Sequence, residues 1–285
     1  MALFASHVDW KPTLMQPMVN IALRAARLAG EQIARSLERL DLIKSEQADV
    51  AEFISGLCQQ AERTIGSNIQ KAYPHHSLMG EYTGQHPPIG EGPGHCEWHI
   101  SPIDSLTNFS NALPMFALSI TGFINGKAEH CVVLNPIFGE EFTASRGGGA
   151  QLNGKRLRVG NRTSLEGAII GTGYHARQSD KPWLESHVRM MREILLAGAT
   201  LHNSGSPVLS LAYTAAGRLD GFYQIGLSPA ELSAGLLLIR EAGGLVGDFS
   251  GGNRYSEHGN LVSANARMLK ALLRTLHPVT ATELR

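Results

Sequence analysis

The stretch that decides the fold of this chain is Trp98-His-Ile-Ser-Pro-Ile-Asp-Ser-Leu-Thr-Asn-Phe109. Its first residues form a short apolar run that predicts a buried strand, and residues 104–108 carry helix-capping and turn side chains. A strand that ends in a carboxylate and hydroxyls at the start of a helix suits a metal ion or a phosphate group. We therefore expect a functional site where this strand ends.

The composition is that of a globular protein. With 285 residues, 43% hydrophobic and 18% charged, the chain is long enough for one large domain or two intimately packed halves. Lys plus Arg and Asp plus Glu number 25 each, so the overall charge gives no direct signal for nucleic acid or an anionic membrane.

Cysteine usage and hydropathy indicate the compartment. Cys58, Cys96 and Cys131 form no CxxC pair and are typical of reduced thiols. His95 and His99 flank Cys96, but this spacing matches no usual zinc pattern. No apolar run approaches the roughly 20 residues that span a bilayer, and the N-terminus lacks a basic region followed by an apolar core. We expect a cytoplasmic protein with no membrane segment.

The first part of the chain carries two helical patterns. Residues 1–14 show no sustained period and predict a loose N-terminal extension, with Met15 or Met18 as alternative starts. Apolar residues at helical spacing predict one helix over residues 17–40 and a second over residues 54–73.

The remaining chain divides into two halves that we expect to pack as one unit. Residues 15–165 form an α+β half, in which Asn125-Gly126 and Asn153-Gly154 predict a largely antiparallel sheet joined by hairpins. Residues 166–285 alternate short apolar runs with helices, which indicates an α/β half. The expected strands cover residues 116–124, 128–134, 141–145, 156–159, 168–172, 220–225, 245–248 and 261–263, and the expected helices cover residues 181–196, 206–217, 229–242 and 264–276.

Several segments point to a family. They are Met15-Gln-Pro-Met-Val-Asn-Ile-Ala-Leu-Arg, Glu141-Phe-Thr-Ala-Ser-Arg, Gln151-Leu-Asn-Gly-Lys-Arg-Leu-Arg-Val, Ala212-Tyr-Thr-Ala-Ala-Gly-Arg-Leu-Asp-Gly and Arg240-Glu-Ala-Gly-Gly. From Met15 onward the chain resembles the inositol monophosphatase family, and within it the bacterial SuhB branch. The resemblance implies an α/β (α+β) fold of the five-layered α-β-α-β-α sandwich type, a homodimer, and Mg²⁺-dependent hydrolysis of phosphate monoesters.

The resemblance also implies which residues would hold Mg²⁺, a hard ion that takes oxygen ligands. Glu81 matches the first metal-binding Glu of the family. In the family signature Asp-Pro-hydrophobic-Asp-Gly-Thr-Thr-Asn, Ser101 replaces the Asp that bridges two metal ions, whereas Ile103, a backbone-carbonyl ligand, and Asp104 are retained. The Asp of the late helix is Glu231 here. We expect a residual set of Glu81, Ile103, Asp104 and Glu231 that binds Mg²⁺ weakly.

The catalytic positions of the family are replaced. A Thr–Asp pair helps to activate the attacking water in the family, whereas Leu106 stands at the Thr position here and Cys58 aligns with the Asp within one or two positions. Leu106 neither donates nor accepts a hydrogen bond, and losing such a pair removes about 10²–10⁴ in rate, or roughly 3–5 kcal/mol. The substrate-binding residues that the resemblance implies are Ser105, Gln224, Gly205 and Ser206.

Two functions of different class remain open. The first is a pseudoenzyme, a catalytically impaired binding or regulatory homologue whose partners, by the SuhB resemblance, are the NusA factor and RNA polymerase. The alternative is an active Mg²⁺-dependent phosphomonoesterase that hydrolyses inositol phosphate or a related small phosphate with a rearranged site of Glu81, Asp104, Ser101 and Glu231.

The same residues have structural interpretations. Glu81 and Asp104 could be caps or loop carboxylates, and Glu231 is equally explained as an acidic residue that a helix N-terminus favours. Cys58 on a helix is more often a small buried hydrophobe than a reactive thiol.

Overall fold

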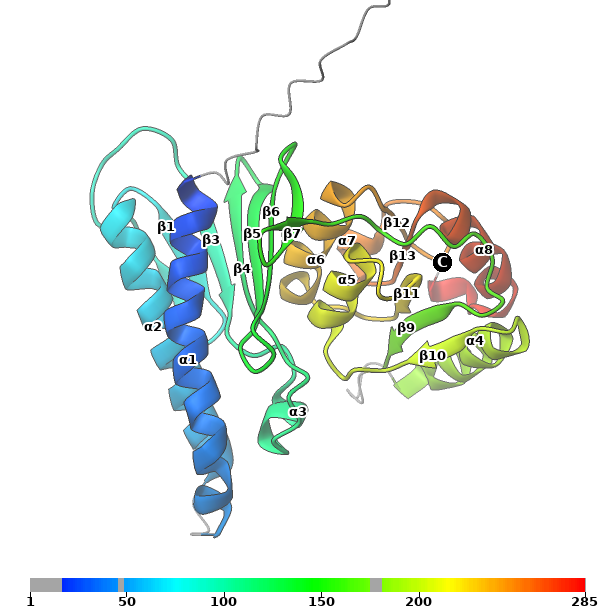
Figure 1. Ribbon diagram of the computed structural model, residues 1–285, viewed down its shortest axis with the longest axis horizontal. Helices are drawn as coiled ribbons and strands as arrows, with labels where there is room; N and C mark the ends of the chain where they lie inside the picture. Colours follow the sequence, from blue (N-terminus) through cyan, green and yellow to red (C-terminus); the bar gives the residue numbers. More distant parts are fainter. Residues whose placement is uncertain (1–16, 46–48, 175–180, 285) are drawn as a thin grey trace, which may run out of the picture.

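The computed structural model describes residues 17–45, 49–174 and 181–284. The expected extension over residues 1–14 lies outside this part of the chain. Layers of helices and sheets alternate across the molecule in Figure 1. This arrangement confirms the α-β-α-β-α sandwich, whereas the division into halves at residue 165 stays a prediction.

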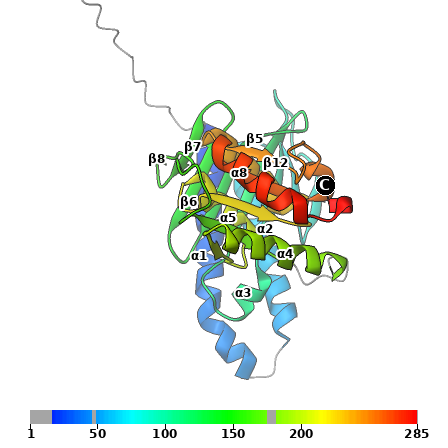
Figure 2. The ribbon, with the colours of Figure 1, turned by 90° about the vertical axis from the view of Figure 1, so that its right-hand side faces the viewer.

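Helices form three of the layers. α1 and α2 cover the outer face of the first sheet, α5 and α6 lie between the sheets, and α4 and α8 cover the outer face of the second sheet, nearest the viewer in Figure 2. The bounds of the helices are α1 Pro17–Ser45, α2 Val50–Ala72, α3 Leu106–Ser110, α4 Leu184–Leu196, α5 Pro207–Ala215, α6 Pro229–Glu241, α7 Tyr255–His258 and α8 Ala266–Leu276, with 3-10 helices at Lys181–Trp183, His277–Val279 and Thr282–Leu284.

The first sheet has the strand order β2-β1-β3-β4-β5-β6-β7-β8 and is antiparallel except for the parallel pair β1 and β3. Asn125 and Gly126 have φ values of 52° and 72°, as a tight hairpin between β4 and β5 requires. The strands are β1 Ser77–Gly80, β2 Gly84–His86, β3 Glu97–Ser101, β4 Leu118–Ile124, β5 Lys127–Asn135, β6 Glu140–Ser145, β7 Gly149–Leu152 and β8 Lys155–Arg156.

The second sheet has the strand order β10-β9-β11-β13-β12. β9 runs parallel to β10 and β11, and β13 runs antiparallel to both of its neighbours. Because parallel strands end at the same edge, Gly173 of β9 lies beside Gln224 of β11. The strands are β9 Ile169–Gly173, β10 Thr200–His202, β11 Gly221–Gln224, β12 Leu245–Gly247 and β13 Leu261–Ala264.

Side-chain caps set the starts of several helices. The Asp49 carboxylate accepts two backbone N–H groups of the first turn of α2, at 2.8 and 3.1 Å, so this helix begins earlier than its apolar pattern predicts. Ser206 Oγ accepts from Leu209 N at 3.1 Å at the start of α5. The cap of α5 matters for the site, because Ser206 also contacts the signature stretch.

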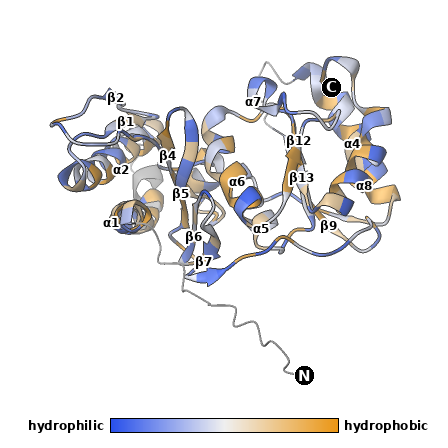
Figure 3. Ribbon diagram, turned by 90° about the horizontal axis from the view of Figure 1, so that it is seen from above, coloured by the Kyte–Doolittle hydropathy of each residue, from blue (hydrophilic) through white to orange (hydrophobic). Residues whose placement is uncertain are grey.

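Buried apolar side chains form three clusters. One lies between α1, α2 and the first sheet, one between the two sheets, and one between the second sheet and the outer helices. Figure 3 shows apolar colouring on α6 and β13 near the centre of the molecule. Within the described ranges, no helix is long and apolar enough to cross a membrane.

Candidate functional site

Ser101 and Glu81 lie at neighbouring strand ends of the first sheet. β1 and β3 run in parallel with Gly80 beside Ile100, so the next residue of each strand emerges at the same edge. Ser101 Oγ donates to Glu81 Oε2 at 2.7 Å. Burial raises the pKa of Glu81, the hydrogen bond from Ser101 lowers it in part, and nearby carboxylates raise it further. One oxygen of Glu81 is thus already engaged by the protein.

Asp104 connects the signature turn to the start of α5. Its Oδ2 accepts from Ser206 Oγ and, at 3.1 Å, from Val208 N, while its Oδ1 accepts from Ala117 N at 2.8 Å. Burial raises the pKa of Asp104 to about 7, although these three hydrogen bonds favour the charged form. Both oxygens of this carboxylate therefore accept protein donors from distant parts of the chain.

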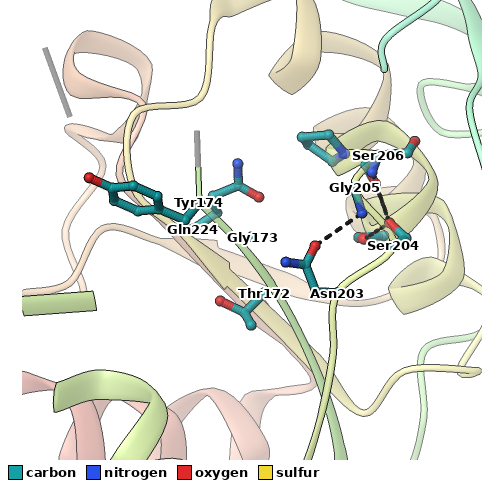
Figure 4. A pocket seen from close by; sticks show the side chains of 10 residues that line it. Thr172, Gly173, Tyr174, Asn203, Ser204, Gly205, Ser206 and Gln224 are labelled. Atoms are coloured by element: carbon teal, nitrogen blue, oxygen red, sulfur yellow. Dashed lines mark hydrogen bonds between the residues drawn. The ribbon is translucent and has the colours of Figure 1, made fainter. Parts of the chain in front are cut away.

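Gly205, Ser206 and Gln224 line one pocket, at the edge of the second sheet where β9 and β11 end (Figure 4). Gly205 N donates to Asn203 Oδ1 at 3.0 Å, and Ser206 N donates to Ser204 Oγ at 3.0 Å. The pocket measures about 30 Å³, room for about two water molecules. Its other lining residues are Thr172, Gly173, Tyr174, Pro207 and Ser210.

A larger cavity of about 380 Å³ lies between strands β1, β3 and β4 and the start of α6. Glu81 and Ser101 line it, together with two hydroxyl side chains of β4. At the start of α6, Ser228 N donates to Glu231 Oε2 at 2.7 Å and Glu231 N donates to Ser228 Oγ at 3.3 Å. This capping box gives Glu231 the helix-terminal role that its position in the sequence suggested.

Cys58 and Leu106 have different surroundings. Cys58 is fully buried in the cluster between α2 and the first sheet. Burial raises the pKa of its thiol to about 12, although a hydrogen bond with Tyr82 lowers it. Leu106 begins α3 with 42% of its surface exposed. Cys58 is therefore a packing residue, and Leu106 presents an apolar side chain at a helix start.

The described carboxylates are not gathered into a metal site. Across residues 17–45, 49–174 and 181–284, no group of three or more His, Cys, Asp and Glu side chains lies together in a way that could hold a metal ion. Asp104 accepts protein donors on both oxygens and Glu81 on one. Mg²⁺ needs near-octahedral oxygen ligands at about 2.0–2.1 Å. A residual metal role for Glu81, Ile103, Asp104 and Glu231 stays a prediction.

The four residues expected to bind substrate lie in two places, the small pocket and the turn before α3. Gly205, Ser206 and Gln224 share the small pocket, where Ser206 also contacts Asp104. Ser105 is buried just before α3, and its side chain makes no cap hydrogen bond. The expected substrate-binding role of these residues stays a prediction.

Some polar residues of these pockets were not predicted from the sequence. Asn108 Nδ2 donates to Met115 O at 2.6 Å and to Ser204 O at 2.8 Å, which joins α3 to the wall of the small pocket. Ser119 and Thr121 line the larger cavity. Their signal was present in the sequence, because hydroxyl residues alternate with apolar ones in the strand over residues 116–124.

The architecture and its pockets define a class of protein. Two mixed sheets in a five-layered stack, with hydroxyl-lined pockets at their strand ends, form an α/β sandwich of the phosphatase type. A sequence profile described as the inositol monophosphatase family matches residues 14–281. This chain belongs to the inositol monophosphatase family.

Curated relatives cover nearly the whole chain. The protein named Nus factor SuhB from Pseudomonas aeruginosa is 48% identical over 264 residues, which cover 93% of this chain and 97% of the relative. The protein of the same name from Escherichia coli K12 is 42% identical over 259 residues, covering 91% of this chain and 95% of the relative.

Solved structures share the fold. The extragenic suppressor protein SuhB from Bartonella henselae superposes with a TM-score of 0.78 at 31% identity, covering 90% of this chain and 97% of that one. The inositol monophosphatase from Anabaena superposes with a TM-score of 0.78 at 26% identity, covering 94% of this chain and 98% of that one.

Proposed function

We propose that this protein is a SuhB-type member of the family that acts by binding or regulation, with a degenerate phosphatase site. The observation that carries the proposal is the environment of Asp104. Both of its oxygens accept hydrogen bonds from Ser206, Val208 and Ala117, so the carboxylate retained from the signature acts as a structural connection.

The neighbouring positions support the same proposal. Ser101 brings a hydroxyl where the family has a bridging carboxylate, and this hydroxyl donates to Glu81. A second Mg²⁺ ion close to a first requires bridging anionic oxygens. Leu106 has no polar atom with which to orient a water molecule. We therefore expect that both metal binding and the activation of the attacking water are impaired.

The proposed partners follow from the relatives. Two of them carry the name Nus factor SuhB, at 48% and 42% identity. We propose a cytoplasmic homodimer that contacts the transcription machinery through the NusA factor and RNA polymerase. Light scattering on the purified protein measures the dimer, and calorimetric titration with purified NusA measures the contact. A monomer that gives no heat with NusA would contradict this part of the proposal.

The proposed loss of catalysis is tested by two measurements on one preparation. Calorimetric titration with Mg²⁺ should show no saturable binding in the low millimolar range. Phosphate release from inositol phosphate and from an aryl phosphate should lie about 10²–10⁴-fold below the rate of an intact relative. Turnover at a substantial fraction of that rate would instead support the alternative, an active phosphomonoesterase with a rearranged site.

A repaired variant provides the complementary test. Cys58→Asp, Ser101→Asp, Leu106→Thr and Glu231→Asp together restore the side chains that the family pattern implies, and they should produce measurable Mg²⁺-dependent phosphate release. Leu106→Thr alone is the matched control, because it adds a hydroxyl without adding a ligand carboxylate, and it should stay inactive. A folded repaired protein without activity would contradict the assignment of these positions.

A further inference from the structure

One wall of the larger cavity, which we call its floor, is formed by paired residues of β3 and β4. His99 of β3 pairs with Thr121 of β4, and Ser101 pairs with Ser119. Leu118 and Ile120 pack on the opposite face, against α1 and α2, so strand alternation turns these hydroxyl side chains towards α6.

Two hydroxyl residues of β4 are buried as residues and line the cavity. Ser119 and Thr121 are 4% and 3% exposed, and both line the cavity. Among the residues that the structure describes, neither hydroxyl makes a hydrogen bond. Because both residues line the cavity, a ligand there can supply the hydrogen bonds that these hydroxyl groups do not make within the protein. These groups are therefore free to bind a ligand that fills the cavity.

The charge around the cavity favours a cation. Glu81 is exposed and lines the cavity, and Glu231, in the first turn of α6, is close enough to act on Glu81 electrostatically. Among the described residues that line the cavity there is no Lys or Arg. A helix N-terminus normally attracts an anion. At the start of α6, however, the capping box already places the Glu231 carboxylate against the helix N-terminus.

We propose that the cavity between β1, β3, β4 and the start of α6 binds a small organic cation that carries hydroxyl groups, an amino alcohol. The ammonium group donates to Glu81 at the rim. The hydroxyl groups of the ligand exchange hydrogen bonds with Ser119 and Thr121 on the floor. The carbon chain lies against Met79 and Pro229, which also line the cavity.

This occupant differs from the metal ion that the family uses. An ammonium group needs one carboxylate and a few neutral acceptors, whereas Mg²⁺ needs a near-octahedral set of oxygen ligands. The volume of about 380 Å³ lies in the range of small-molecule pockets. The proposal rests on the proposed function, because an active phosphatase site would use Glu81 as a ligand for its metal ion.

A matched pair of ligands tests the role of charge. Diethanolamine and diethylene glycol have the same chain and terminal hydroxyl groups, but only the first carries a charged amine at neutral pH. We expect saturable binding of diethanolamine by the full-length protein in ligand titrations followed by NMR, and at least tenfold weaker binding of diethylene glycol. Equal affinity for the two ligands would overturn the proposal. So would a diethanolamine titration that shows no saturation up to about 50 mM.

A matched pair of variants tests the location. Ser119→Ala removes a hydroxyl from the floor of the cavity and should weaken diethanolamine binding about 3- to 10-fold. Ser263→Ala is the control, because Ser263 is also a buried strand residue whose hydroxyl has no partner in the described structure, but it does not line the cavity. Equal binding by the wild type, Ser119→Ala and Ser263→Ala would place the ligand elsewhere and refute the site. Glu81→Gln should weaken binding by at least tenfold, and an unchanged affinity would refute the role of the carboxylate.

Discussion

The hydrogen bond from Ser206 Oγ to Asp104 Oδ2 joins residues 102 positions apart in the chain, and a double-mutant cycle measures what it contributes. In Asp104→Asn, the amide offers one acceptor oxygen where the carboxylate offers two. The N–H of Ala117 on one side and that of Val208 on the other cannot both keep an acceptor. One buried N–H group left without a partner costs about 1–3 kcal/mol of stability.

Ser206→Ala removes the other end of the same hydrogen bond. It also removes the cap of α5, because Ser206 Oγ accepts from Leu209 N, and a lost cap costs about 0.5–2 kcal/mol. Since Ser206→Ala removes the Asp104–Ser206 bond and Asp104→Asn removes the charge that strengthens it, the double variant should be less destabilised than the sum of the two by about 1 kcal/mol, within the range found for residues in contact.

The assay is urea unfolding at pH 8. This pH lies above the value of about 7 to which burial raises the pKa of Asp104, so the carboxylate is largely ionised. Asn265→Ala is the control, because it removes the cap of α8 and has no contact with Asp104; its cycle with Asp104→Asn should be additive. Additive losses for Asp104→Asn and Ser206→Ala would refute the reasoning that the carboxylate connects the two segments.

Three further predictions concern stability. His76 Nδ1 accepts from Trp98 Nε1 at 3.0 Å, and burial lowers the pKa of His76 to about 4. Between pH 6.5 and pH 4 the unfolded chain therefore binds a proton at His76 that the folded protein does not. The free energy of unfolding should fall by up to about 1.4 kcal/mol per pH unit over this range as the pH is lowered. His76→Gln should remove this part of the slope in urea titrations, and parallel pH profiles would contradict it. Glu62→Gln should cost about 1–3 kcal/mol in urea unfolding, because the buried Glu62 accepts three donors from the turn after β1, and an unchanged midpoint would be inconsistent with that role. Gly235→Ala should lower the melting temperature, at a cost of about 1–3 kcal/mol, because its Cβ would lie 2.5 Å from a leucine methyl of α5. The control Gly56→Ala meets nothing within 4 Å and should stabilise α2 by about 0.5–1 kcal/mol; equal shifts in the two variants would count against the packing argument.

Local patterns in the sequence predicted many of the elements. The Asn125-Gly126 pair predicts a tight hairpin because both residues tolerate positive φ, and the structure has both there. The helix over residues 54–73 was predicted too short at its start, because the Asp49 cap lies outside the apolar pattern. The strand expected over residues 156–159 is reduced to Lys155–Arg156 at the edge of the first sheet, since edge pairing depends on the neighbouring strand rather than on the strand's own residues.

The candidate site was predicted in part. Gly205, Ser206 and Gln224 were named from the sequence, and they line one pocket. Ser119 and Thr121 were missed, although their alternation was visible. Nothing in the sequence indicated that α6 would leave that part of the sheet face open.

The sequence alone determined the family of this chain, the type of most of its elements, and the chemical nature of each signature position, because periodicity, turn residues and side-chain identity are local properties. Leu106 cannot orient a water molecule in any fold. Only the tertiary structure decided what the retained carboxylates do. The donors to Asp104 come from residues 13 to 104 positions away, and the cavity beside Glu81 is formed by strands and a helix that meet only in the folded protein. Such partners are fixed by how the two sheets and their helices pack, and no local pattern contains that information.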